Sequence, residues 1–218
     1  NAARMAEAER LRKARFAACF DEKKAAAYPE AEEIFHRAGE NFEEVYTFLS
    51  KDENPNRKKL LFSLALKDAK DLKASVLEDH LNCEQGDLPE EIFRKDLLCP
   101  RIFLEELTPY RSMIRGFFEE ETKHSFAEQP ERILDYLKKN ITFHAEEEYD
   151  TIMATPVGVL TMKQGSPLAQ KILFVAICRS LNVAARLNPV TLEPEYYRDG
   201  AFHSVETEAA VLKDETES

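Results

Sequence analysis

The chain has 218 residues, of which 44% are hydrophobic and 33% are charged, a balance typical of a globular protein with a substantial core. Its net charge is −11, and the longest basic cluster is residues 56–61, so we expect no nucleic-acid partner and no docking on an anionic membrane surface. No run of 18 apolar residues occurs, which argues against membrane insertion.

The cysteines and histidines lack the spacings of metal sites. The four cysteines contain no C-x-x-C pair, and we interpret them as buried thiols: Cys19, Cys83, Cys99 and Cys178. No H-x-x-x-H or H-E-x-x-H spacing occurs, and the acidic run 146–150 lacks the alternation of a calcium loop. A glycine-rich phosphate loop is also missing. We therefore predict no metal and no cofactor.

The first 125 residues read as a helical region. Apolar residues recur at helical spacing, Pro29 suits a helix start and Gly39 a helix end. The predicted helices are 2–27, 29–39, 40–51, 56–67, 67–81, 88–98 and 108–121. The polar segment 124–130 ends on proline and is the most plausible domain boundary.

After this boundary the pattern changes to a mixture of helix and strand. We predict helices over 130–140 and 167–181, joined by a loop with a short helical turn within 146–165. Strand candidates at 183–190, 193–198 and 201–206 are rich in β-branched and aromatic residues, and "RDG" at 198–200 is a hairpin signal. Residues 209–218 read as a polar tail or the start of a missing segment. The fold class is therefore α+β.

Three pieces of sequence, in order, carry a family resemblance. The helix "LDYLKKNITF" supplies Asn140, Ile141 and Phe143; "TPVGVLTMKQG" ends on Gly165; and "CRSLNVAAR" supplies Arg179 and Arg186. Residues from about 130 to 205 thus resemble the core of the transglutaminase-like superfamily, a papain-like fold shared by transglutaminases, some peptidases and many uncharacterised bacterial domains. The resemblance implies a core over 126–208, with a nucleophile-type helix packed on a short antiparallel sheet.

The resemblance also implies a cysteine nucleophile at the start of the helix 167–181. There the helix dipole and unpaired N–H groups would lower the pKa of a thiol. Counting back from Ala185 and Arg186 places this cysteine at Pro167, which has no nucleophile. We interpret Ser166 as the helix cap before a proline at the first helical position, and Ser166 as a nucleophile is the alternative. Cys178, three turns further along, reads as a core residue.

The family's histidine has two possible registers. In one, His203 and Glu206 form a contracted version of the motif "H-x-W-x-E". In the other, which we prefer, "DGAFHSV" matches a later strand and the histidine position falls near Thr191–Glu193, where this chain has none. The closest candidate for the third triad member is Asp214, in the polar tail.

Three hypotheses follow. The first is a degenerate transglutaminase-like domain, a pseudoenzyme acting as a structural module or binding a peptide, protein or glycan. The second is an active amidase, peptidase or acyl transferase that uses Ser166, or an unrecognised nucleophile, with His203. The third is a helical scaffold with only architectural resemblance. An antiparallel sheet over 183–206, packed on the helix 167–181, would exclude the third.

Overall fold

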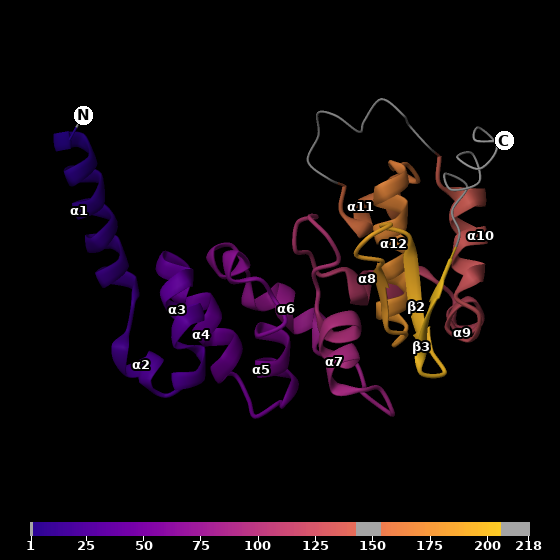
Figure 1. Ribbon diagram of the computed structural model, residues 1–218, viewed down its shortest axis with the longest axis horizontal. Coiled ribbons are helices and arrows are strands. Elements are labelled where there is room, and N and C mark those ends of the chain that lie inside the picture. The colour runs from indigo at the N-terminus through magenta and orange to yellow at the C-terminus, as the bar shows by residue number, and fades with distance from the viewer. Residues whose placement is uncertain (1, 143–153, 206–218) are drawn as a thin grey trace. The chain divides into compact units, whose positions relative to one another are not determined.

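The computed structural model describes residues 2–142 and 154–205, and the chain separates into two compact units, Asn1–Leu81 and Asn82–Ser218 (Figure 1). Helices predominate and a small antiparallel sheet lies in the second unit, which confirms the α+β class. The boundary predicted at 125/126 falls inside the second unit. Four predicted features lie outside the described residues: Phe143, the run 146–150, Glu206 and Asp214.

Over its described residues, the first unit contains helices and connecting turns and no strand. Its elements are α1 (Ala2–Cys19), α2 (Glu22–Ala26), η1 (Pro29–Ala31), α3 (Glu32–Ala38), η2 (Gly39–Asn41), α4 (Phe42–Ser50), α5 (Asn56–Leu61), η3 (Leu66–Lys70) and α6 (Ala74–His80). The prediction of one helix over 2–27 is wrong, because the Asp21 carboxylate accepts hydrogen bonds from the backbone N–H groups of Lys23 and Lys24 and starts a new helix.

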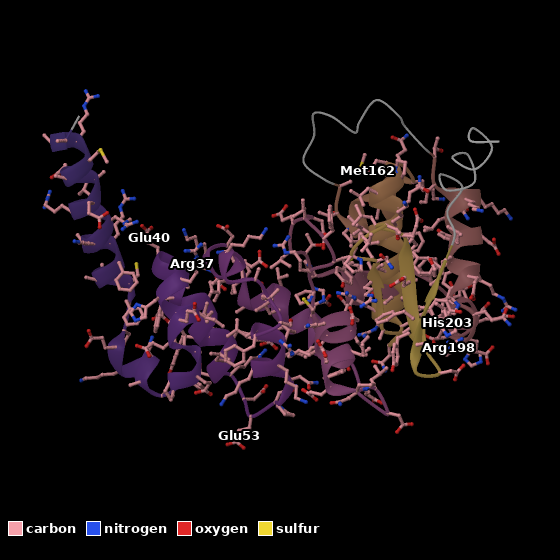
Figure 2. All side chains as sticks on the ribbon, in the orientation of Figure 1. Arg37, Glu40, Glu53, Met162, Arg198 and His203 are labelled. Atoms are coloured by element: carbon pink, nitrogen blue, oxygen red, sulfur yellow. The ribbon has the colours of Figure 1, made fainter. Side chains whose placement is uncertain are left out.

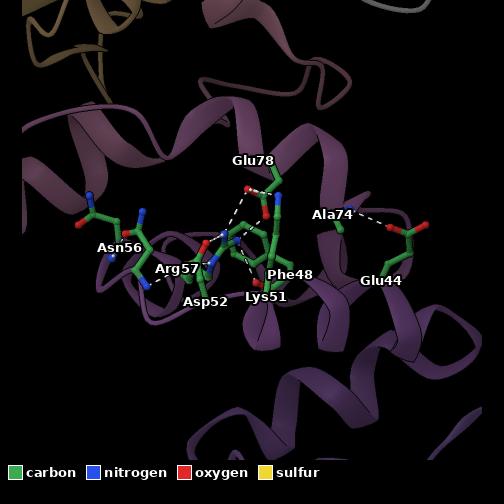
Figure 3. A network of polar contacts seen from close by, with 9 residues as sticks. Glu44, Phe48, Lys51, Asp52, Asn56, Arg57, Ala74 and Glu78 are labelled. Carbon is green, nitrogen blue, oxygen red and sulfur yellow. Dashed lines mark hydrogen bonds and ion pairs between the residues drawn. The ribbon is translucent and has the colours of Figure 1, made fainter.

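A buried arginine joins three helices of this unit. The Arg57 side chain, 3% exposed, donates two 2.7 Å hydrogen bonds to the Asp52 carboxylate and one of 3.0 Å to the Phe48 carbonyl. It also contacts Glu78 on α6, which in turn pairs with Lys51 at 3.1 Å (Figure 3). These contacts bind α5 to α4 and α6, because a buried guanidinium is stable only when its donors are satisfied.

The second unit contains the remaining helices and the sheet. Its elements are α7 (Glu90–Ile92), η4 (Phe93–Leu98), α8 (Tyr110–Phe117), α9 (Glu120–Glu128), α10 (Glu131–Asn140), α11 (Pro156–Met162), α12 (Pro167–Ser180), β1 (Ala185–Leu187), β2 (Pro194–Arg198) and β3 (Ala201–Ser204). Among the described residues, no helix has the length and apolar content needed to cross a bilayer.

Residues 124–128 of the predicted boundary segment belong to the helix α9. Phe126 is 5% exposed and packs edge-on against Phe118 and Tyr136, with ring centroids 5.3 and 5.9 Å away. Phe126 thus packs this otherwise polar helix on the core, and Arg198 of the sheet donates to the carbonyls of Ala127 and Glu128 at 2.7 and 2.5 Å.

The sheet is a three-stranded antiparallel meander in the order β1-β2-β3. The turn between β2 and β3 has Asp199 at φ 52° and Gly200 at φ 81°, a left-handed pair that suits a tight hairpin. β1 and β2 pack on α12, where every residue from Ile172 to Ser180 is buried (Figure 1). This arrangement excludes the hypothesis of a helical scaffold.

Three arginines connect the C-terminal end of α12 to neighbouring segments. Arg179, 2% exposed, donates to the carbonyls of Ala185, Cys99 and Arg101 at 2.9, 2.6 and 3.0 Å. Arg111 donates to the Arg179 carbonyl at 2.8 Å, and Arg115 to the Ser180 carbonyl at 2.6 Å. Since the last carbonyls of a helix have no partner within it, these bonds attach the segment around 99–115 firmly to α12.

Candidate active-site region

The turn before α12 depends on a close approach of two helices at Gly165. A Cβ atom built there would lie 2.9 Å from Val159 Cγ1 on α11, closer than side-chain atoms normally come. The Gly165 N–H donates to the Thr142 carbonyl at 3.2 Å, and the Thr142 N–H to the Lys163 carbonyl at 2.9 Å. Gly165 therefore places the start of α12 against α11 and against the chain that follows α10.

Asn140 ends α10, two residues before the bridge to this turn. Its side-chain amide donates to the Tyr136 carbonyl at 2.8 Å, within the last turn of the helix. The next residue, Ile141, is 6% exposed in the core, and Thr142 then pairs with Gln164 in an isolated parallel bridge. The described geometry thus brings the family-motif residues Asn140 and Gly165 into one structural unit.

Ser166 and Pro167 form the start of α12. The Ser166 Oγ accepts a hydrogen bond from the Ala169 N–H at 3.2 Å, and Pro167 occupies the first helical turn. Proline suits this position because its missing N–H would have had no partner within the helix. The hydroxyl at this site is therefore engaged in capping, and its neighbour supplies no titratable group.

An ion pair lies beside this helix start. Lys171, one turn into α12, contacts Glu193 with Nζ and Oε1 2.6 Å apart, and the two side chains are 12% and 19% exposed. Glu193 immediately precedes β2 and belongs to the segment in which the preferred register places the family's histidine. The pair links α12 to the start of β2. The sequence patterns did not predict this contact.

His203 lies elsewhere on the sheet. It pairs with Tyr196 across β2 and β3 with the rings stacked 5.4 Å apart, and its Nε2 lies 3.0 Å from the Arg198 carbonyl. Figure 2 shows His203 beside Arg198, well separated from Met162, which precedes the Gly165 turn.

The separation follows from the position of Tyr196, which lies on β2 beside the C-terminal part of α12. Tyr196 pairs with Ala185, whose carbonyl accepts a hydrogen bond from Arg179, the residue after Cys178 on α12. Burial together with a hydrogen bond to Glu131 raises the pKa of Tyr196 to about 12. Ser166 and Cys178 are twelve positions apart, which corresponds to about 18 Å of α-helix. The strand pairing therefore places His203 toward the C-terminal end of α12, and the structure does not bring Ser166 and His203 together.

Arg186 has a partner on the neighbouring strand. Its Nε donates to Glu195 Oε2 at 2.9 Å, and its guanidinium lies 3.6 Å from the centre of the Phe202 ring. Asn188 donates to the other Glu195 oxygen at 2.6 Å. Glu195, 7% exposed, thereby has both oxygens satisfied, and this network fixes the register of β1, β2 and β3.

Cys178 lies in the core, as the sequence predicts. It is fully buried, and burial raises its pKa well above the ordinary range of a thiol. A buried, protonated thiol is a poor nucleophile.

We expect iodoacetamide at neutral pH to modify Cys19 first, since it is the half-buried cysteine, whereas Cys83, Cys99 and Cys178 are buried. Peptide mass spectrometry against time would give the order, with labelling in urea as the reference for full access. A Cys19→Ser variant should lose the fast phase. Fast modification of native Cys178 would contradict its placement in the core.

The described residues offer no obvious site for a metal ion. Over 2–142 and 154–205, no three His, Cys, Asp or Glu side chains gather closely enough to hold one. The polar groups around α12 are instead engaged with one another, as the pair Lys171–Glu193 and the network at Glu195 illustrate.

Comparison with known families agrees with this geometry. Residues 111–206 match the family model of the transglutaminase-like superfamily. The second unit therefore contains a transglutaminase-like domain, formed by α8 to α12 and the sheet. No curated protein and no solved structure matches the chain.

Proposed function

We propose that the transglutaminase-like domain acts as a binding or structural module and lacks the cysteine chemistry of its superfamily. The observation that carries this proposal is the start of α12, where Pro167 occupies the position assigned to the nucleophile and Ser166 Oγ serves as the cap. The Lys171–Glu193 ion pair adds support, because it lies where the preferred register expects a histidine. A peptide, a protein or a glycan is the expected class of ligand.

Acyl-transfer assays test the proposal directly. The intact protein, incubated with a glutamine-containing peptide and a fluorescent primary amine, should incorporate no more amine than its Ser166→Ala variant. Hydrolysis of the peptide amide, followed by mass spectrometry, should likewise not depend on Ser166. An active transglutaminase serves as the positive control. Turnover that disappears in both Ser166→Ala and His203→Ala would overturn the proposal in favour of an amidase, peptidase or acyl transferase.

The same variant has a predicted effect on stability. Removing the Ser166 hydroxyl leaves the Ala169 N–H without its cap, which should lower the free energy of unfolding by about 1 kcal/mol. Thr161→Ala is a suitable control, since its exposed hydroxyl bonds only to carbonyls of α11 at 2.8 and 3.2 Å. Urea unfolding of both variants should show a clear loss for Ser166→Ala alone. Equal losses would contradict a capping role.

A further inference from the structure

The first unit contains a cleft that the transglutaminase-like domain does not account for. It has a volume of about 690 Å³ and lies between one face of α1 and the end of α3, η2 and η3. Clefts of this size are typical of sites for small organic molecules. The cleft lies wholly within the first unit, so its shape is set by elements of that unit alone.

The charge lining this cleft is positive, although the protein is acidic. Four cations line it, Arg12, Lys13, Arg37 and Lys70, against two acids, Glu9 and Glu40. The two acids already have partners: Glu9 pairs with Arg12 at 3.0 Å and Lys13 at 3.9 Å, and Glu40 with Arg15 at 3.9 Å.

Two of the cations form no ion pair with the described residues of the chain. Within the part of the chain that the structure describes, neither Arg37 nor Lys70 has an acidic partner within 4.0 Å. Figure 2 shows Arg37 next to Glu40 on α3 and η2. Since Glu9 pairs with Arg12 and Lys13, and Glu40 with Arg15, the side chains of Arg37 and Lys70 are left as donors for an incoming anion.

One wall of the cleft is aromatic. Phe16 of α1 and His36 of α3 line it, with their rings nearly parallel and 5.8 Å apart. The Phe20 ring packs against both, 4.9 Å from Phe16 and 4.8 Å from His36. Aromatic side chains offer flat apolar area to a ring, and an arginine beside them can stack on the same ring.

We propose that this cleft binds a small planar organic anion, whose ring lies against Phe16 and His36 and whose acid group contacts Arg37 and Lys70. The acid group is a phosphate or a carboxylate, because both accept hydrogen bonds from arginine and lysine. The site is independent of the transglutaminase-like domain and of its proposed function.

The test is a titration of the isotope-labelled intact protein, followed by NMR, with phenyl phosphate, benzoate, inorganic phosphate and benzyl alcohol as probes. We expect phenyl phosphate or benzoate to shift the amides of residues 36–41, with inorganic phosphate and benzyl alcohol each at least about fivefold weaker, since each lacks one of the two features recognised. The tighter of the first two probes identifies the acid group. No saturable shift at residues 36–41 with either probe would overturn the proposal.

Two charge reversals locate the site. Lys70→Glu and Arg37→Glu should each weaken the tighter probe at least about tenfold, because each replaces an attraction by a repulsion. Lys23→Glu, an exposed lysine of α2 outside the cleft, changes the net charge equally and should weaken it less than about twofold. If the NMR spectrum of a charge-reversal variant shows misfolding, Arg37→Gln, which only removes the charge, takes its place. Equal weakening by Lys70→Glu and Lys23→Glu would show binding to general surface charge and overturn the proposal.

Discussion

Replacing Arg179 by methionine is expected to lower the free energy of unfolding of the second unit by about 3–5 kcal/mol. The methionine keeps much of the length of the side chain but donates nothing to the carbonyls of Ala185, Cys99 and Arg101. Buried acceptors that lose a charged donor pay their full desolvation cost, so the loss should exceed that of an ordinary hydrogen bond.

Urea denaturation of the intact protein, with hydrogen exchange to assign the transition to residues 82–205, measures this loss. Arg132→Met is the matched control, since Arg132 is exposed and bonds only to the Ser125 hydroxyl. It should cost less than about 0.5 kcal/mol. Arg179→Lys should fall between the two, because one ammonium cannot reach carbonyls on both sides as a guanidinium does. A loss below about 1 kcal/mol in Arg179→Met would show that the carbonyls find other donors.

The second large effect is expected in the first unit, where Arg57→Met should cost about 3–5 kcal/mol. The change removes the bidentate contact with Asp52 and the bond to the Phe48 carbonyl, and it leaves Glu78 with Lys51 alone (Figure 3). Lys58→Met is the control, because Lys58 is 55% exposed and its pair with Glu30 lies at the surface. Hydrogen exchange at residues 45–49 would report the loss within the first unit.

The same network predicts how stability depends on pH. Hydrogen bonds from Arg57 lower the pKa of Asp52. Burial raises the pKa of Glu78, but hydrogen bonds from Arg57 and Lys51 outweigh burial, so the pKa of Glu78 is also lowered. A carboxyl group whose pKa is lowered by folding stabilises the fold at pH values above its pKa in the unfolded chain, which is near 4. This contribution is lost as the pH falls further. The wild-type first unit should therefore lose stability more steeply below pH 4 than Arg57→Met. Parallel curves from pH 5 to 2 would contradict the role of Arg57.

Much of the second unit follows from local sequence signals. The start of α12 is visible because Gly165, Ser166 and Pro167 each have a distinct backbone preference. The hairpin is visible for a similar reason, since Asp199 and Gly200 both tolerate a left-handed conformation. Such signals act over a few residues, so they can be recognised in the sequence without knowledge of the tertiary structure.

The contacts between distant segments could not be predicted in this way. Lys171 and Glu193 are 22 positions apart, and each looks like an ordinary surface charge in the sequence. The extent of the first predicted helix was wrong for a related reason, because Asp21 reads as a tolerable helical residue until its carboxylate is seen to cap α2. Charged side chains have too many possible partners for spacing alone to choose one.

The arginines at the end of α12 bear on how this domain could be separated from its chain. The family match begins at Arg111, yet Arg179 donates to the carbonyls of Cys99 and Arg101. The Asn182 side chain also accepts a 2.8 Å hydrogen bond from the Glu84 N–H and donates one of 3.0 Å to the Glu84 carbonyl. In a fragment that begins at residue 111, the side chains of Arg179 and Asn182 would lose these backbone partners. The smallest autonomous piece should begin near Asn82, about thirty residues before the start of the family match. In this protein the unit of homology is therefore shorter than the unit of folding.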